Sequence, residues 1–216
     1  MNNLLECADI ILTNPPFGTK IGITDDSLLR MYEFGYNWSY SEKEKTWYKL
    51  NTLVKSQAPQ VLFLELCVRL LKLGGKMAIV LPEGIFGNKS LGYIWAYLKK
   101  HGRVLAMIDC PRNTFQPSTD TKTDVLIYEK GSRISDDIYV AVAKRCGHDK
   151  RGRVTNSENQ PLPNDFENFL PLSSLTKPCI NTSWKGVCFI HSIPENVILT
   201  TQKNIISYPV TNTLVG

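Results

Sequence analysis

The sequence has no apolar run near the roughly 20 residues that a membrane-spanning helix needs. Its longest apolar stretch, residues 61–73, is interrupted by Glu65, Arg69 and Lys72. The first residues also lack the basic start, apolar core and small-residue cleavage site of a signal peptide. These absences argue against a membrane partner and predict a cytoplasmic chain.

Cysteine is present without the spacing of a metal site. None of the six cysteines forms a C-x-x-C pair, and no histidine stands at a zinc-finger spacing. Several cysteines lie in apolar runs, where the free thiol behaves as a small hydrophobic group. We therefore expect a reduced protein that holds no metal.

The chain also lacks a strong excess of charge. Its net charge of +5 is compatible with a nucleic-acid partner and does not require one. Five basic residues nevertheless crowd into one short segment, opposed only by Asp149. They are Lys144, Arg145, Lys150, Arg151 and Arg153. This segment is either a surface for DNA phosphates or a solvated turn.

Hydrophobic patterning predicts an α/β fold. Residues 8–13 form a short apolar run that ends at a turn, as a buried strand of a parallel sheet does. Residues 61–73 are apolar on nearly all sides and predict a buried helix, ended by two glycines. Residues 76–81 are a second buried strand. A strand, a helix and a strand in this order indicate a βαβ unit of a parallel sheet.

Further elements follow along the chain. We expect a helix over residues 90–100 and a strand over 103–109. Residues 123–129 and 138–143 alternate more clearly, and we expect them to form an antiparallel edge of a mixed sheet. Short strands are also expected near residues 187–190 and 197–199.

The segment between the first strand and the first helix is rich in aromatic residues. Ser41 followed by Glu44 resembles a capping box, so we expect a helix over residues 42–55 within a long loop. The aromatic residues from Tyr32 to Tyr48 either hold a substrate strand or pack against the sheet.

The feature with chemical content is Asn14-Pro15-Pro16-Phe17, which directly follows the first strand. Open α/β sheets bind ligands at the carboxyl ends of their strands. The two prolines fix the backbone and offer no N–H, so carbonyl oxygens dominate the turn. Asn-Pro is also a common turn dipeptide. Its position before a further helix and strand favours a ligand site over a plain turn.

Such a turn suits an exocyclic amine. The adenine amino group is a poor nucleophile because its lone pair is delocalised into the ring. The Asn14 side-chain oxygen and the Pro15 carbonyl would accept its two hydrogens, at about 3 kcal/mol per contact by analogy with oxyanion donors. Phe17 would stack on the base, a contact worth about 1–3 kcal/mol. A base in a duplex must first leave the stack.

At this point the sequence resembles a known family. Residues 8–20 are similar to a motif in the modification subunits of type I restriction systems, which are N6-adenine DNA methyltransferases that use S-adenosylmethionine. Three further blocks agree in order. They are residues 60–84, 111–123 and 147–152, and the resemblance spans residues 5–153. Several motifs in order are more specific than one tetrapeptide.

The resemblance implies the C-terminal half of a Rossmann-like methyltransferase fold. It implies catalytic roles for Asn14, Pro15, Pro16 and Phe17, with Thr13 and Asn14 beside the cofactor. In the family, the glycine-rich cofactor loop precedes this motif, but here only thirteen residues precede Asn14. We therefore expect a truncated domain that is inactive or weak alone.

The resemblance also implies a substrate surface and partners. The predicted substrate-binding residues are Phe115, Lys122, Lys144, Arg145, Lys150 and Arg151. Phe115 lines the base pocket or anchors a loop as a core aromatic, and Glu83 faces the site or caps a turn. The implied partners are DNA and separate specificity and restriction subunits.

Composition and resemblance together divide the chain into three regions. Residues 1–150 are the acceptor-side catalytic half. Residues 151–183, rich in Asn, Ser, Thr and Pro, are a linker or loosely ordered arm, and residues 184–216 begin a C-terminal region.

Two other functions remain open. Asn-Pro-Pro before an aromatic residue also serves enzymes that methylate protein glutamine or RNA bases, because each of these presents a planar nitrogen. Alternatively, the chain is a non-catalytic remnant, or a piece that complements an upstream fragment.

Overall fold

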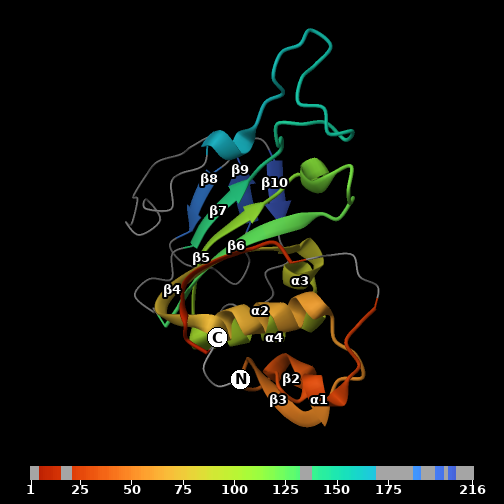
Figure 1. Cartoon of the computed structure of the whole chain (residues 1–216). Helices are drawn as coiled ribbons and strands as arrows, with labels where there is room; N and C mark the ends of the chain where they lie inside the picture. Colours follow the sequence, from red (N-terminus) through yellow and green to blue (C-terminus); the bar gives the residue numbers. More distant parts are fainter. Residues whose placement is uncertain are drawn as a thin grey trace.

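The computed structural model describes residues 5–15, 21–131, 138–168, 187–190, 198–201 and 204–207. Its main sheet has six strands in the order β1-β4-β6-β5-β7-β8. Two helices, α2 and α4, pack against one face of this sheet, and a small hairpin lies beyond them (Figure 1). Among the described helices, none is both long and apolar enough to cross a bilayer.

The strands and helices have the following bounds. The main sheet contains β1 (Ala8–Thr13), β4 (Leu71–Pro82), β5 (Gly102–Asp109), β6 (Thr123–Lys130), β7 (Ile138–Val142) and β8 (Val187–Ile190). The α-helices are α1 (Asp26–Leu29), α2 (Pro59–Leu70), α3 (Glu83–Gly87) and α4 (Gly92–His101). The short 3-10 helices are η1 (Glu33–Gly35), η2 (Lys89–Leu91), η3 (Arg112–Phe115) and η4 (Asp165–Asn168). Two separate pairs complete the list, β2 (Tyr36–Ser41) with β3 (Thr46–Leu53), and β9 (Ile198–Thr201) with β10 (Asn204–Ser207).

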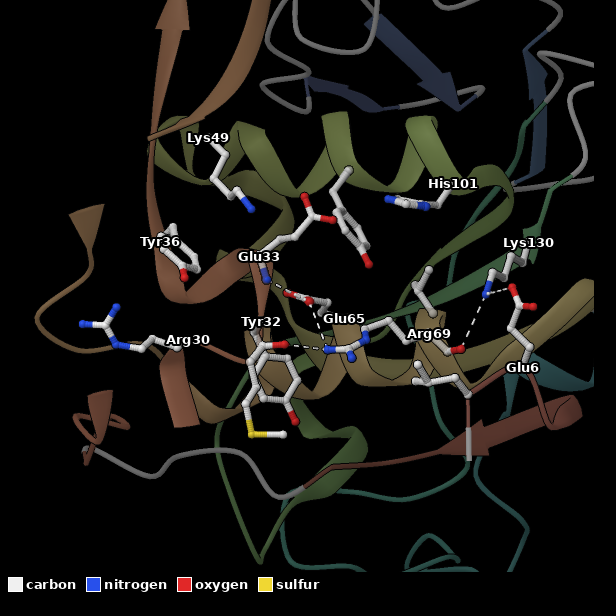
Figure 2. A pocket seen from close by; sticks show the side chains of 14 residues that line it. Glu6, Arg30, Tyr32, Glu33, Tyr36, Lys49, Glu65, Arg69, His101 and Lys130 are labelled. Atoms are coloured by element: carbon white, nitrogen blue, oxygen red, sulfur yellow. Dashed lines mark hydrogen bonds and ion pairs between the residues drawn. The ribbon is translucent and has the colours of Figure 1, made fainter. Parts of the chain in front are cut away.

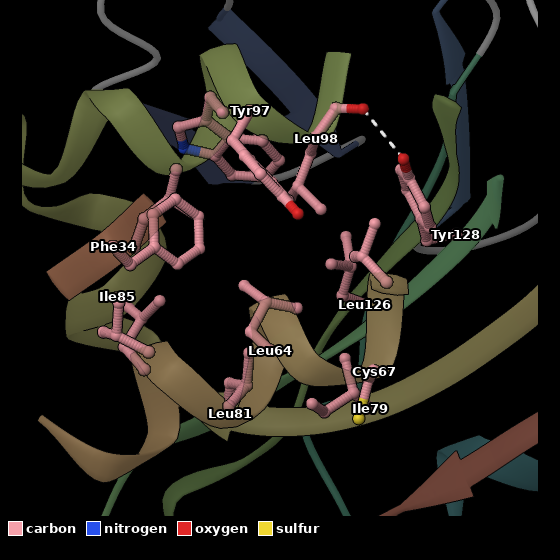
Figure 3. Close-up of a cluster of buried hydrophobic side chains, with 14 of the residues drawn as sticks. Phe34, Leu64, Cys67, Ile79, Leu81, Ile85, Tyr97, Leu98, Leu126 and Tyr128 are labelled. Atoms are coloured by element: carbon pink, nitrogen blue, oxygen red, sulfur yellow. Dashed lines mark hydrogen bonds between the residues drawn. The ribbon is translucent and has the colours of Figure 1, made fainter. Parts of the chain in front are cut away.

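The core lies between the sheet and helices α2 and α4. Pro59 occupies the first turn of α2, where its missing N–H has no helical partner to lose. Leu64, Ile79, Leu126 and Tyr128 are fully buried in this layer (Figure 3). Burying each such side chain stabilises the fold by about 1.5–3 kcal/mol. The Tyr128 hydroxyl also donates to the Leu98 carbonyl at 2.9 Å, so its polar end is satisfied.

The predicted α/β class is confirmed, but the positions of two strands were wrong. Strand β6 is antiparallel to both β4 and β5 and lies between them, inside the sheet. Strand β7 pairs parallel with β5, and the antiparallel edge is β8. Burial alternates along residues 123–129 because successive side chains point to opposite faces of the sheet. Leu126 and Tyr128 face the helices, whereas Val125 and Ile127 face the other side, where they are half-buried.

The predicted helix over residues 42–55 is wrong, because this segment forms the β2–β3 hairpin. The Ser41 hydroxyl does accept the Glu44 N–H at 3.1 Å, but it does so within the hairpin turn. Trp38 stacks on Tyr93 of α4, with ring centroids 5.6 Å apart. Packing of the aromatic stretch is thus confirmed for Trp38, although its partner is the helix and not the sheet.

The other predicted elements are present with shifted ends. The helix predicted over residues 61–73 ends at Leu70, because the chain enters β4 before Gly74, which has a φ of +77°. The strand and helix predicted over 103–109 and 90–100 correspond to β5 and α4. Strands β8 and β9 match the two short C-terminal predictions. The division at residues 150 and 183 stays a prediction.

Asp124, at the start of β6, is a buried carboxylate. It is only 1% exposed, and both side-chain oxygens lack a hydrogen-bond partner within the described part of the chain. Burial raises the pKa of Asp124 to about 7, with Glu83 adding to the rise and Lys122 opposing it. The folded chain therefore binds this proton more tightly than the unfolded chain does.

We predict that Asp124→Asn stabilises the protein at neutral pH. Because the pKa is raised, the stability of the native protein falls as pH rises from about 4 toward 7, and stays low above that. One pKa unit corresponds to about 1.4 kcal/mol, so the gain is a few kcal/mol near pH 8 and less than half of that near pH 5. Urea unfolding at both pH values measures it. Asp26→Asn on the exposed surface is the control, and an equal gain at both pH values would contradict the assignment.

Candidate active site

The turn after β1 lies at the carboxyl edge of the sheet. Thr13 pairs with Ile79 of the parallel strand β4, so Asn14 and Pro15 leave the sheet near the end of β4 and the start of β6. Pro15 is buried, while Asn14 is exposed and its side chain has no partner among the residues that the structure describes. The turn thus offers a fixed backbone and an unused carboxamide. Pro16 and Phe17 lie outside the described residues.

Strand β1 is less buried than the sequence predicts. Ile11 packs against the core, but Ile10 and Leu12 are 69% and 78% exposed. The reason is that β1 is an outer strand, and no described element covers the face toward which Ile10 and Leu12 point. The prediction of a strand buried on both faces was therefore wrong for the described part of the chain.

A cavity of about 520 Å³ opens beside Asn14. Its volume is within the range of about 300–1,000 Å³ that is usual for small-molecule sites. Two segments far apart in the sequence form its walls. They are Asn14 and Pro15 from the turn, and Thr114, Phe115, Gln116, Ser118 and Thr119 from η3 and the following loop. The structure thus brings together three predicted site residues, Asn14, Pro15 and Phe115.

The polar residues around Phe115 were not predicted to belong to the site. Thr114, Gln116, Ser118 and Thr119 line the cavity, although only Phe115 was predicted to do so. Their signal was a polar run around one aromatic residue, between two strands. A polar run of this kind can be assigned to a site only once the structure shows that the loop faces Asn14.

Hydrogen bonds within residues 111–120 hold the loop that lines the cavity in place. The Thr114 hydroxyl donates to the Pro111 carbonyl at 2.6 Å, and the Arg112 guanidinium donates to the Asp120 carboxylate at 3.3 Å. The Gln116 amide donates to the same carboxylate. A loop fixed by its own hydrogen bonds presents its side chains without a large ordering cost on binding.

Lys122 has partners within the chain. Its ammonium contacts the Asp109 carboxylate and donates to the Cys110 carbonyl at 2.8 Å. These contacts tie the end of β5 to the start of β6. Substrate binding by Lys122 stays a prediction, and the geometry favours a structural role.

Glu83 and Thr13 lie near the cavity without lining it. Glu83 begins α3, and its backbone N–H donates to the Lys122 carbonyl at 3.0 Å. Thr13 is half-buried at the end of β1. This contact agrees with the predicted role of Glu83 in the turn after β4. Whether Glu83 also faces the site stays a prediction.

The predicted substrate-binding cations differ in their contacts. The Arg145 guanidinium pairs with Asp165 at 2.6 Å. Lys144, Lys150 and Arg151 are exposed, and their charged groups have no partner among the described residues. The structure therefore separates a cation that holds the fold from three that are available to a ligand.

A second cavity, of about 760 Å³, lies at the opposite end of the sheet (Figure 2). The Glu65 carboxylate lies at its centre and accepts the backbone N–H groups of Glu33 and Phe34 at 2.9 and 2.8 Å. Burial raises the pKa of Glu65, and these two N–H groups oppose the rise. Arg69 donates to the Met31 carbonyl at 2.7 Å. The central carboxylate of this cavity and Arg69 thus have hydrogen-bond partners within the chain.

A family model described as N-6 DNA Methylase matches residues 2–170. The methylase subunit of the Type I restriction enzyme EcoEI from Escherichia coli is 28% identical over 127 residues, which are 58% of this chain and 22% of that protein. The chain therefore spans about a fifth of the length of this curated relative.

Solved structures share the fold. A type I restriction-modification methyltransferase subunit from Streptococcus thermophilus matches with a TM-score of 0.56 and 24% identity, over 87% of this chain and 35% of that one. A modification subunit from Vibrio vulnificus YJ016 matches with a TM-score of 0.53 and 18% identity, over 97% and 40%. A protein from Listeria monocytogenes, described as a class I S-adenosylmethionine-dependent methyltransferase, matches with a TM-score of 0.51 and 20% identity, over 67% and 39%. These likenesses confirm the predicted methyltransferase fold.

We predict that Lys122→Met destabilises the protein. The substitution leaves the Asp109 carboxylate and the Cys110 carbonyl without the ammonium, which costs about 1–3 kcal/mol. Urea unfolding measures this loss against Lys89→Met, which removes an exposed lysine. Unchanged stability together with weaker nucleic-acid binding would instead show that Lys122 serves the substrate.

Proposed function

The chain belongs to the N-6 DNA methylase family, and on this premise we propose that the cavity beside Asn14 is the acceptor half of a methyltransferase active site. It would hold an adenine of DNA, whose N6 receives the methyl group. One observation carries the proposal. An exposed carboxamide with no partner among the described residues and a backbone turn built on proline share one cavity with an aromatic side chain, Phe115.

The chain's own groups would act mainly by positioning the amine. The Asn14 side-chain oxygen and the Pro15 carbonyl oxygen accept hydrogen bonds from its two N–H groups. These bonds draw the nitrogen toward a tetrahedral form and free its lone pair. Each contact contributes about 3 kcal/mol by analogy with oxyanion donors, because the acceptors are fixed before the reaction. Phe115 offers a ring against which the base rests. The methylated amine then loses its extra proton to water.

S-adenosylmethionine is the proposed cofactor and supplies the electrophilic methyl group when bound. Thr13 and Asn14, at the end of β1, are the residues that this chain would place beside it. They fit one side of such a molecule only, because β1 is an outer strand and Ile10 and Leu12 on its open face are exposed. We therefore propose that methyl transfer requires further polypeptide against β1, and that the described part alone is inactive or weak.

The biological setting follows from the relatives and is proposed for the whole protein only. The names of the curated relative and of two of the structures place those proteins in type I restriction enzymes or restriction-modification systems. We propose that this chain serves site-specific adenine methylation of DNA in such a system, with separate specificity and restriction subunits. Methylation of glutamine or RNA, and a non-catalytic role, are the competing outcomes.

We predict weak binding of the cofactor by the isolated chain. Calorimetric titration with S-adenosylmethionine is expected to give no affinity in the micromolar range, which would correspond to about −8 kcal/mol. The reason is that no described element covers the open face of β1, next to Thr13 and Asn14, the residues that we assign to the cofactor. Micromolar binding, or Asn14-dependent formation of N6-methyladenine by the chain alone, would contradict the need for further polypeptide. Mass spectrometry of the product separates N6-methyladenine from methylglutamine.

We also predict that the cavity binds an adenine-like base. An oligonucleotide that carries the fluorescent base 2-aminopurine is expected to show quenching on binding, because the base stacks in the cavity. Phe115→Ala should weaken this binding by roughly 5- to 100-fold, which corresponds to about 1–3 kcal/mol. Asn14→Ala should weaken binding of the matched oligonucleotide that carries adenine, because 2-aminopurine lacks the 6-amino group that Asn14 would hold, and the exposed position of Asn14 leaves folding unchanged.

Tyr48→Ala is the matched control, since Tyr48 is an aromatic residue of the hairpin and is 46% exposed. Urea unfolding verifies that each variant is folded. Equal affinity of the Phe115, Asn14 and Tyr48 variants would remove the cavity from consideration as the base site.

A further inference from the structure

The segment from Gly147 to Arg153, here named the basic turn, is organised around one carboxylate. Asp149 accepts the backbone N–H groups of Arg151 and Arg153 at 2.9 Å each, and pairs with the Arg153 guanidinium at 2.6 Å. These contacts lower the pKa of Asp149 to about 2. The single acidic residue of the turn is thus used to shape it, and Arg153 is used with it.

The charged groups of the remaining cations take no part in these internal contacts. Lys150 and Arg151 are exposed, and no described residue pairs with either charged group. Lys144 is also exposed. Only its backbone N–H is used, by the Asp165 carboxylate at 2.9 Å. Two exposed cations on a shaped turn, with Lys144 as a third a few residues before it, form an arrangement that suits phosphate groups along a nucleic-acid backbone.

The basic turn is attached to the wall of the cavity. The Asn113 side chain donates to the His148 carbonyl at 2.7 Å, and His148 Nε2 lies 3.2 Å from the Thr114 carbonyl. Thr114 itself lines the cavity beside Phe115. Gly152 also lies near Pro117, since a Cβ added at Gly152 would come 3.4 Å from the proline ring. The distance between the free cations and the cavity is therefore fixed by direct contacts.

We propose that the basic turn, with Lys144, binds the phosphate backbone of the strand whose base enters the cavity. His148 and Asn113 are positioning residues that set the spacing between the phosphate site and the base site. This inference rests on the proposed function, because it assigns the cavity to a base. It adds a second site on the same substrate and divides the basic cluster into ligand-binding and structural cations.

The first test measures the salt dependence of binding to a single-stranded oligonucleotide that carries 2-aminopurine, with the full chain. Each phosphate contact contributes about 0.7 to the slope of log affinity against log salt for a single strand. The double variant Lys150→Gln/Arg151→Gln is expected to lose about 1.4 from this slope, and several-fold in affinity at low salt. The control is Lys43→Gln/Lys89→Gln, which removes the same charge from exposed sites elsewhere.

The second test separates positioning from charge. His148→Ala and Asn113→Ala leave every cation in place, so the salt slope should stay within about 0.3 of the original value, well below the 0.7 of one contact. Quenching of 2-aminopurine should fall at least twofold at saturating chain, because the bound strand no longer delivers its base to the cavity. His148→Gln keeps one donor toward the Thr114 carbonyl and should restore part of the quenching.

The outcomes distinguish this inference from the proposed function. If the double variant and its control show the same slope while Phe115→Ala still weakens base binding, the basic turn is only a solvated turn. If the slope falls as expected but Phe115→Ala has no effect on quenching, the phosphate site stands and the cavity is not the base site. An unchanged quenching signal in folded His148→Ala and Asn113→Ala would overturn the positioning role.

Discussion

The antiparallel strand β6 between β4 and β5 is the constraint on which the candidate site depends. The chain leaves β5 at Asp109 and must re-enter the sheet at Thr123, both at the carboxyl edge. The connection between them therefore lies over the same edge where β1 ends at Thr13. This is why Phe115 and Asn14 share a cavity although they belong to distant parts of the sequence. The chain returns from β5 to β6 much as in a hairpin, and this return places residues 110–122 over the edge. No pairing with a more distant segment is needed to bring them there.

The same constraint accounts for the unusual electrostatics beside the site. A strand inside the sheet is covered on the side of α2 and α4, so the first residues of β6 are buried with it. Asp124 is buried there without a hydrogen-bond partner, and Lys122 pairs with Asp109 one strand away. The Lys122 ammonium lowers the cost of the Asp124 charge but does not remove it, since the Asp124 pKa still rises to about 7. At the carboxyl edge, the contact of Lys122 with Asp109 joins the two strands, and the buried charge of Asp124 beside it lowers the stability of the fold.

Local pattern predicted most elements of the sheet, because most of them bury an apolar run that is visible in the sequence, although Ile10 and Leu12 of β1 stay exposed. It could not predict where β6 lies, since strand order depends on pairing between distant segments. The β2–β3 hairpin was missed for a related reason, because the contact of Trp38 with Tyr93 overrides a weak helix signal at Ser41. At the site, Asn14 and Phe115 were identified from motifs. The pairing of Arg145 with Asp165 was not, because it closes a loop of twenty residues between groups that no local pattern connects.

Volume alone would favour the other end of the molecule over the proposed site. The larger cavity, near Glu65, contains more charged groups, but its central carboxylate accepts two backbone N–H groups and Arg69 is held by a carbonyl. His101 Nε2 has no hydrogen-bond partner among the described residues, yet it is buried from solvent, and burial lowers the His101 pKa. The smaller cavity instead keeps an exposed acceptor, Asn14, without a partner in the described structure. An exposed carboxamide can exchange its hydrogen bonds with water for hydrogen bonds to a ligand without breaking any contact on which the fold depends, so the accessible Asn14 side chain supports the proposed site better than cavity size does.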